Sequence, residues 1–177
     1  MVKLNLTSQI VLNKVPEEFY HPKTAVELSE LTRCEKIPTT IFPKSEEGAR
    51  SIANAIEKTI RQKQQSGQYC VLGLGTGSSL TPVFNELIRL HKEEGLSFSN
   101  VIVFNAYEYF PLQAGAKNST LNQLKERLLN HVDVNPQNVF SPEGTVPQER
   151  VQEFCRLYEQ RIQSFGGIDI MLLGIGR

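Results

Sequence analysis

The sequence is poor in the residues that build metal sites and disulfide frameworks. It has no tryptophan, three histidines and three cysteines. Cys34, Cys70 and Cys155 are odd in number and far apart, which predicts reduced thiols packed in the fold and no disulfide scaffold. No cluster of histidine and cysteine has zinc-ligand spacing, so we expect no metal site.

The chain also lacks an excess of charge of either sign and any long apolar run. Nineteen Lys and Arg balance nineteen Asp and Glu, which excludes the strongly basic face that nucleic acids require. No apolar run approaches the ~20 residues of a membrane helix. Residues 1–8 lack the apolar core of a secretory signal. The composition predicts a cytoplasmic globular protein with no nucleic-acid or membrane partner.

Residues 1–44 differ from the rest of the chain, because they show no sustained hydrophobic period. The prolines that interrupt them are Pro16, Pro22, Pro38 and Pro43. We expect an irregular N-terminal arm with a short strand over 37–42 and no helix. Residues 45–177 form the predicted α/β domain, and a chain of 177 residues is long enough for one such core.

Helical and strand periodicities alternate from Ser45 onward. A helix with Ser45 as N-cap and Gly67 as its stop precedes a buried strand over 69–74. The elements expected after it are a helix from Thr81 as N-cap to Gly95, a strand over 101–105, a helix over 121–132 with Asn118 as N-cap, a helix from Pro147 to Gly166, and a strand over 168–174.

Strands that alternate with helices predict a three-layer, Rossmann-like α/β sandwich with a mainly parallel sheet. Ligands of such sheets bind beyond the carboxyl ends of the strands. By that rule the candidate binding segments are the loops 75–81, 105–119 and 174–177.

The first of these loops is rich in glycine and hydroxyl side chains. Residues 75–79, Gly75-Thr76-Gly77-Ser78-Ser79, join a buried strand to a helix, and we call them the glycine loop. Its backbone N–H groups and the positive end of the following helix form a cradle suited to a phosphate. The spacing fits neither a Walker P-loop nor a dinucleotide fingerprint, which favours a phosphorylated small metabolite. A tight strand-to-helix turn with ordinary capping is the alternative.

Ordered motifs extend this pattern over residues 69–177. Gly73-Leu74-Gly75-Thr76-Gly77 resembles the Gly-Leu-Pro-Thr-Gly loop of the glucosamine-6-phosphate deaminase/isomerase family. Phe104-Asn105-Ala106-Tyr107-Glu108-Tyr109 resembles its Phe-Asn-x-Asp-Glu-Tyr. The other matching segments are Leu90-His91-Lys92, Ser97-Phe98, His131-Val132-Asp133-Val134, Cys155-Arg156-Leu157-Tyr158-Glu159, Ser164-Phe165-Gly166 and Gly174-Ile175-Gly176.

The resemblance implies a fold related to 6-phosphogluconolactonase, and an aldose–ketose isomerisation that converts glucosamine 6-phosphate to fructose 6-phosphate and ammonia. It implies no metal or organic cofactor, an amino-sugar phosphate or another hexose phosphate as ligand, and a homo-oligomer as one state of assembly. The family's ring-opening residues would follow Gly176, so we expect a divergent member whose fold is incomplete at the C-terminus.

The family's proton-transferring Asp falls on Tyr107. A carboxylate is ionised at neutral pH and a phenol is not, so this exchange removes the expected base. Glu108 is ionisable and adjacent, although neighbouring side chains of an extended segment point to opposite sides. Tyr107 and Glu108 are therefore the catalytic candidates. A sensor or scaffold that binds sugar phosphate without turnover, and a 6-phosphogluconolactonase-like hydrolase, are the alternatives.

Asn105 and Tyr109 complete the predicted substrate-binding set with Gly75, Thr76, Gly77, Ser78 and Ser79. Asn105 either contacts substrate or forms the turn after its strand. Tyr109 either contacts the sugar or packs in the core. We expect structural roles for His91 and His131, with His131 near a helix C-terminus.

Overall fold

The computed structural model describes residues 23–33, 37, 39–113 and 115–175. The chain divides into two compact units, Met1–Gly48 and Ala49–Arg177. The domain boundary expected at residues 44 and 45 stays a prediction.

The first unit contains a helix that the sequence analysis did not expect. Helix α1 (Ala25–Thr32) starts at a capping box, in which Thr24 Oγ1 accepts a hydrogen bond from Glu27 N and Glu27 Oε2 accepts one from Thr24 N. The Thr-x-x-Glu spacing was the available signal. The strand expected over 37–42 is wrong for Ile37 and residues 39–42, and residue 38 lies outside the described residues. A proline on each side of 39–42 removes donors that a strand ladder needs.

The second unit is built on a four-stranded sheet in the order β3-β2-β1-β4. β1 (Cys70–Leu74) lies between β2 (Val101–Asn105) and β4 (Ile170–Leu172), and β2 also pairs with β3 (Val139–Phe140). Every pairing is parallel, which confirms the predicted α/β fold class. β4 is shorter than the strand expected over 168–174. β3 was missed because two residues carry no measurable period.

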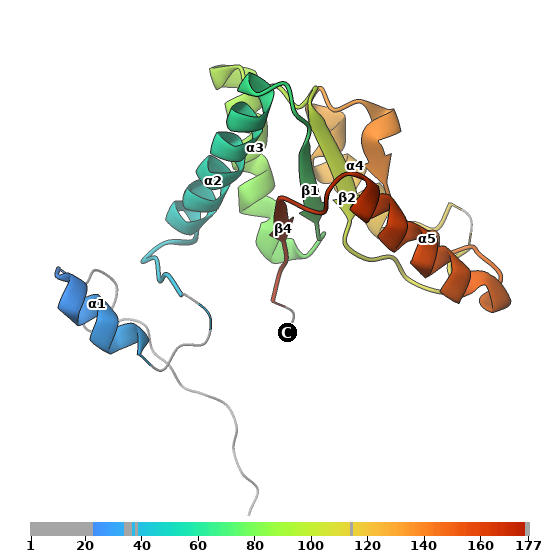
Figure 1. Cartoon of the computed structure of the whole chain (residues 1–177), viewed down its shortest axis with the longest axis horizontal. Coiled ribbons are helices and arrows are strands. Elements are labelled where there is room, and N and C mark those ends of the chain that lie inside the picture. Colours follow the sequence, from blue (N-terminus) through green and yellow to red (C-terminus); the bar gives the residue numbers. More distant parts are fainter. Residues whose placement is uncertain (1–22, 34–36, 38, 114, 176–177) are drawn as a thin grey trace, which may run out of the picture. The chain divides into compact units, whose positions relative to one another are not determined.

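The sheet has a core on each face, as the alternation of its side chains requires. Cys70, Leu72 and Leu74 pack with the helices α2 (Ser45–Gln65), α3 (Thr81–Glu94) and α4 (Thr120–Arg127). Val71, Ile102 and Phe104 face the other way and pack with α5 (Val151–Ser164). Figure 1 shows α2 and α3 on one side of the strands and α5 on the other. These layers confirm the predicted three-layer arrangement.

The helices follow the predicted ranges, with differences at their ends. α3 starts at Thr81 itself, because the 3-10 turn Ser78–Leu80 precedes it and Leu80 occupies the N-cap position. The N-cap of α4 is Ser119, whose hydroxyl accepts a hydrogen bond from Asn122 N, so the expectation for Asn118 is wrong by one residue. α4 ends at Arg127, and the residues expected to continue it form the 3-10 turn Leu129–His131.

Two of the cysteines lie among the described residues. Cys70 is buried and unpaired, and burial raises the pKa of its thiol to about 12. The burial of this free thiol confirms the prediction that Cys70 is reduced and packed in the fold. Cys155 is a free thiol as well, but it is exposed on α5, so the prediction that it packs in the fold is wrong.

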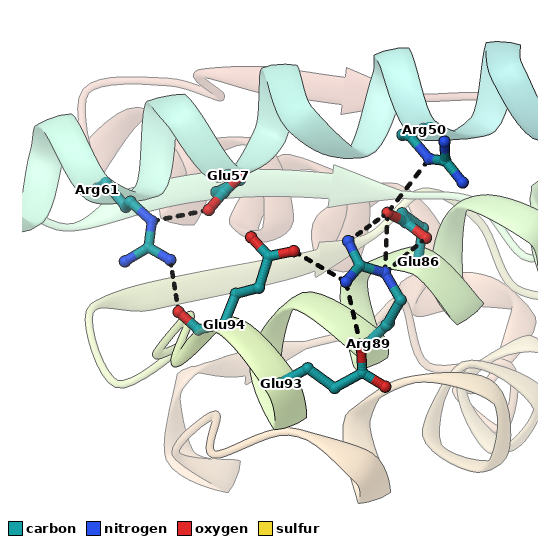
Figure 2. Close-up of polar contacts among 7 residues, drawn as sticks. All are labelled: Arg50, Glu57, Arg61, Glu86, Arg89, Glu93 and Glu94. Carbon is teal, nitrogen blue, oxygen red and sulfur yellow. Dashed lines mark hydrogen bonds and ion pairs between the residues drawn. The ribbon is translucent and has the colours of Figure 1, made fainter.

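A set of ion pairs connects α2 and α3 on their solvent side (Figure 2). Arg89 pairs with Glu86 and with Glu94 at 2.8 Å each. Arg50 of α2 lies 3.8 Å from the Glu86 carboxylate, and Arg61 donates to the Glu94 carbonyl oxygen at 3.0 Å. The hydrogen bond from Arg89 keeps the pKa of Glu86 below its usual range. Exposed pairs of this kind add little stability one by one.

Candidate functional site

A cavity of about 440 Å³ opens at the carboxyl ends of β1 and β4. It lies where a parallel sheet places its ligands, and each of the three predicted segments, loops 75–81, 105–119 and 174–177, supplies residues to its lining. The residues that line it are Gly77, Ser78, Ser79, Tyr107, Leu173, Gly174 and Ile175. Residues 176–177, at the end of the third loop, lie outside the described residues.

The glycine loop divides into a buried half and an accessible half. Gly75 is buried, and its amide donates to the Leu172 carbonyl oxygen at 2.9 Å, so that N–H is not available to a ligand. Thr76 is buried as well, at 4% exposure. Ser78 and Ser79 are exposed. Of the five predicted phosphate-binding residues, the structure therefore brings the last three to the cavity.

The amides of Gly77, Ser78 and Ser79 have no hydrogen-bond acceptor among the residues that the structure describes. The next amide, that of Leu80, donates to the Gly77 carbonyl oxygen at 3.0 Å and closes the 3-10 turn. The first amides of a helical turn have no partner within the turn and can bind an anion. These three N–H groups are therefore backbone donors with no acceptor among the described residues.

Gly174 allows the segment after β4 to approach this turn. A Cβ atom at Gly174 would lie 2.8 Å from Ser79 Oγ, so the Ser79 hydroxyl would have to move if position 174 carried a side chain. The segment after β4 and the glycine loop therefore approach closely at a position that has no side chain. Sequence analysis included Gly174 in a candidate loop without finding this role.

Tyr107 borders the cavity from the loop after β2. Its hydroxyl lies 3.4 Å from Thr76 Oγ1 and 3.5 Å from Thr76 N, and its side chain is 43% exposed. It is the one catalytic candidate among the cavity-lining residues. The phenol therefore lies at the same cavity as Gly77, Ser78 and Ser79.

Glu108 points away from this cavity and caps helix α4. Its carboxylate accepts hydrogen bonds from Thr120 N at 2.8 Å and from Ser119 Oγ at 2.7 Å. The amides of Tyr109 and Leu121 donate to it as well, at 3.0 and 3.3 Å. Partial burial would raise the pKa of Glu108, but these hydrogen bonds outweigh it and leave the pKa lowered. The geometry is that of a structural cap, and the sequence rule that neighbours point apart anticipated it.

Asn105 is buried with 0% exposure and ties the second loop together. Its Nδ2 lies 2.9 Å from each of three acceptors, the Tyr107 carbonyl oxygen, Thr120 Oγ1 and Ser141 Oγ. Of the two roles left open by the sequence, these contacts favour the turn-forming one. Tyr109 is 53% exposed and does not line the cavity, so the structure does not bring it to the other candidates.

The motif histidines lie in structural contacts. His91 Nδ1 is 2.6 Å from the Leu96 carbonyl oxygen, and its ring meets the Phe98 ring edge-on. Asp133 accepts hydrogen bonds from Phe98 N at 2.5 Å and from Ser97 Oγ at 2.7 Å. Partial burial acts to raise the pKa of Asp133, but these hydrogen bonds hold it below its ordinary value. These contacts therefore hold residues 96–98, in the connection between α3 and β2, against α3 and the segment that carries Asp133. The ring of His131 contacts the Glu126 carbonyl oxygen at 2.9 Å, near the end of α4.

Sequence reasoning missed Arg127. Its Nη1 donates a hydrogen bond of 2.6 Å to the Thr76 carbonyl oxygen in the glycine loop. Helical periodicity puts Arg127 on α4, but nothing in the sequence connects it to a residue 51 positions earlier. Across the described residues, no group of three His, Cys, Asp or Glu side chains could hold a metal ion. None of the described helices is long and apolar enough to cross a membrane.

The sequence of this chain is similar to that of a known protein family. Residues 43–177 match the family model of glucosamine-6-phosphate isomerases/6-phosphogluconolactonase. A glucosamine-6-phosphate deaminase-like protein of Bacteroides thetaiotaomicron is 60% identical over 99% of this chain, which covers 26% of that protein. Glucosamine-6-phosphate deaminase 2 of Giardia intestinalis is 41% identical over 75% of the chain and 48% of its own length.

Solved structures show the same likeness. A monomeric glucosamine-6-phosphate deaminase superimposes with a TM-score of 0.69 at 37% identity, over 75% of this chain and 53% of that one. A 6-phosphogluconolactonase from Plasmodium vivax, at 22% identity and a TM-score of 0.60 over 75% of this chain and 44% of its own, shares the fold. The chain spans about half the length of the curated deaminases that it matches.

Proposed function

The chain belongs to the glucosamine-6-phosphate isomerase/6-phosphogluconolactonase family, and we propose that it binds an amino-sugar phosphate of the glucosamine 6-phosphate type. The phosphate lies on the amides of Gly77, Ser78 and Ser79, and the sugar extends toward Tyr107. The names of the relatives, which are glucosamine-6-phosphate deaminases, supply the substrate class.

The observation that carries this proposal is the set of unbonded amides at the mouth of the cavity. Backbone N–H groups in a fixed turn bind a phosphate dianion without the entropy cost of ordering side chains. Gly75 and Thr76 were predicted to bind the phosphate as well. They are buried, and the Gly75 amide bonds to the Leu172 carbonyl oxygen, so we assign them a structural role in the loop. A cavity of about 440 Å³ is of the size that small ligands occupy.

The reaction expected of the family is an isomerisation in which a base moves a proton from C2 to C1 of the open-chain sugar, with loss of ammonia. We propose that this chain's residues bind and orient the substrate and that Tyr107 contacts the sugar. The carboxylate of Glu108 is occupied at the start of α4, so a proton transfer through it would first require that cap to open.

A second candidate function is sugar-phosphate binding without turnover. The observation that favours it is the placement of the two catalytic candidates. Tyr107 lines the cavity but has no carboxylate, and the carboxylate of Glu108 is hydrogen-bonded at the start of α4. A Tyr107→Asp variant separates the two. It restores a carboxylate at the cavity, so turnover appears in this variant if only the base is missing.

The test measures the melting temperature with glucosamine 6-phosphate, and with glucosamine and inorganic phosphate as matched controls. At a ligand concentration of about 100 times Kd, binding stabilises the fold by about 2.7 kcal/mol, which raises Tm by roughly 5–10 °C for a chain of this size. Glucosamine, which has no phosphate, produces no shift.

Product assays for ammonia and fructose 6-phosphate then decide between turnover and binding alone. A third assay, for hydrolysis of 6-phosphogluconolactone, tests the lactonase alternative. No thermal shift with glucosamine 6-phosphate, fructose 6-phosphate or inorganic phosphate would contradict the binding proposal itself.

A further inference from the structure

Helix α4 contacts two of the three segments that border the cavity. At its start, Glu108 accepts the amide hydrogen bond of Thr120, which ties the helix to the loop after β2. At its end, Arg127 donates to the Thr76 carbonyl oxygen of the glycine loop at 2.6 Å. Arg127 is half-buried and is not among the residues that line the cavity. It therefore acts on the site through Thr76.

The bond to Thr76 fixes the orientation of one peptide plane. In a trans peptide the carbonyl oxygen and the following N–H point in opposite directions. The oxygen of Thr76 and the N–H of Gly77 belong to the same peptide unit. When the guanidinium of Arg127 holds the oxygen on the α4 side, the N–H of Gly77 is turned the other way, and Gly77 lines the cavity.

We propose that Arg127 is a positioning residue, which sets the Thr76–Gly77 peptide so that the Gly77 N–H faces the bound anion. The proposal rests on the function proposed above, since it names the residue that prepares that site. A charged donor on the carbonyl also polarises the peptide and strengthens its N–H as a donor. The guanidinium adds a positive charge behind the loop, on the side away from the ligand.

Arg127→Met and Arg127→Lys test this proposal, with Lys125→Met as the control. Lys125 is an exposed cation in the same last turn of α4, and its replacement removes the same charge without touching Thr76. The first measurement is calorimetric titration of the full chain with glucosamine 6-phosphate and with inorganic phosphate. We expect Arg127→Met to weaken binding about tenfold or more, Arg127→Lys to retain part of the affinity, and Lys125→Met to bind like the wild type.

The second measurement is the residual dipolar coupling of the Gly77 N–H without ligand, which reports the direction of that bond. Arg127→Met changes this coupling, whereas Arg127→Lys and Lys125→Met leave it near the wild-type value. Binding and a Gly77 coupling that are both unchanged in Arg127→Met would overturn the proposal. If the wild type binds neither ligand, the function proposed above fails, while the coupling still decides whether Arg127 orients the peptide.

Discussion

The carboxylate of Glu108 accepts a hydrogen bond of 2.8 Å from the amide of Thr120, so the acidic residue beside Tyr107 is part of the start of helix α4. The hydroxyl of Ser119 donates to the same carboxylate at 2.7 Å. The two neighbours in the sequence thus have separate tasks. Tyr107 borders the cavity, and Glu108 positions the helix that reaches back to the glycine loop.

Replacing Glu108 by Gln should destabilise the fold by about 1–2 kcal/mol at pH 7, because an uncharged amide is a weaker acceptor at a helix start. The pKa of Glu108 is lowered in the folded state. Its charge therefore stabilises the fold above the unfolded pKa of about 4.3, and that contribution is lost as pH falls through the lower folded pKa. Chemical denaturation at pH 7 and near pH 3 measures this difference between variant and wild type.

Glu159→Gln is the matched control, because Glu159 is an exposed carboxylate on α5. It should change stability by less than about 0.5 kcal/mol at either pH. If Glu108→Gln lowers the free energy of unfolding by the same amount at pH 7 and pH 3, the charge of Glu108 does not stabilise α4.

The accessible half of the glycine loop can be tested by removing one amide. Ser78 is the first residue of the 3-10 turn, a position that accepts proline, and Gly77 has the extended ψ of 148° that a residue before proline needs. Ser78→Pro should keep the fold and weaken phosphate binding about tenfold. Ser78→Ala, which keeps the N–H and removes the hydroxyl, should weaken binding less. Calorimetric titration with glucosamine 6-phosphate compares the two, and equal affinities would exclude this amide as a donor.

The loop that carries Tyr107 and Tyr109 depends on a second glycine. A Cβ atom at Gly144 would lie 2.2 Å from the Tyr109 carbonyl oxygen, a backbone atom that cannot rotate away. Gly144→Ala should therefore destabilise the fold by at least about 2 kcal/mol. Gly77→Ala is the control, since Gly77 has a φ of −57° and its nearest neighbour, Ser79 Oγ, is 3.7 Å from the added atom. Thermal unfolding of both variants measures the contrast, and similar melting temperatures would contradict it.

The periodic elements of this fold could be predicted because each carries its own signal. The run Cys70–Leu74 is apolar on both faces, and the stripe of Ala49, Ala53, Ile56 and Ile60 is the buried side of α2. Ile52 belongs to the same apolar pattern but is exposed. The position of the cavity could also be predicted, because the carboxyl ends of parallel strands meet at one edge of the sheet and ligands bind there.

Which residues of the site bond within the fold and which are left for a ligand could not be predicted. Gly75 and Ser78 belong to the same loop. The amide of Gly75 donates to the carbonyl oxygen of Leu172, nearly a hundred residues later in the chain, whereas the amide of Ser78 has no acceptor among the described residues. The contact of Arg127 with Thr76 likewise depends on where α4 ends in space. These hydrogen bonds join residues that are far apart in the sequence, so they depend on tertiary packing and cannot be read from local periodicity.

The most direct test of the central claim is a ¹⁵N–¹H NMR titration of the full chain with glucosamine 6-phosphate. We predict that the amide resonances of Gly77, Ser78 and Ser79 move downfield in proportion to occupancy, while that of Gly75, already bonded to Leu172, moves least. Saturable changes confined to residues away from the glycine loop, or no change at millimolar ligand, would contradict the account.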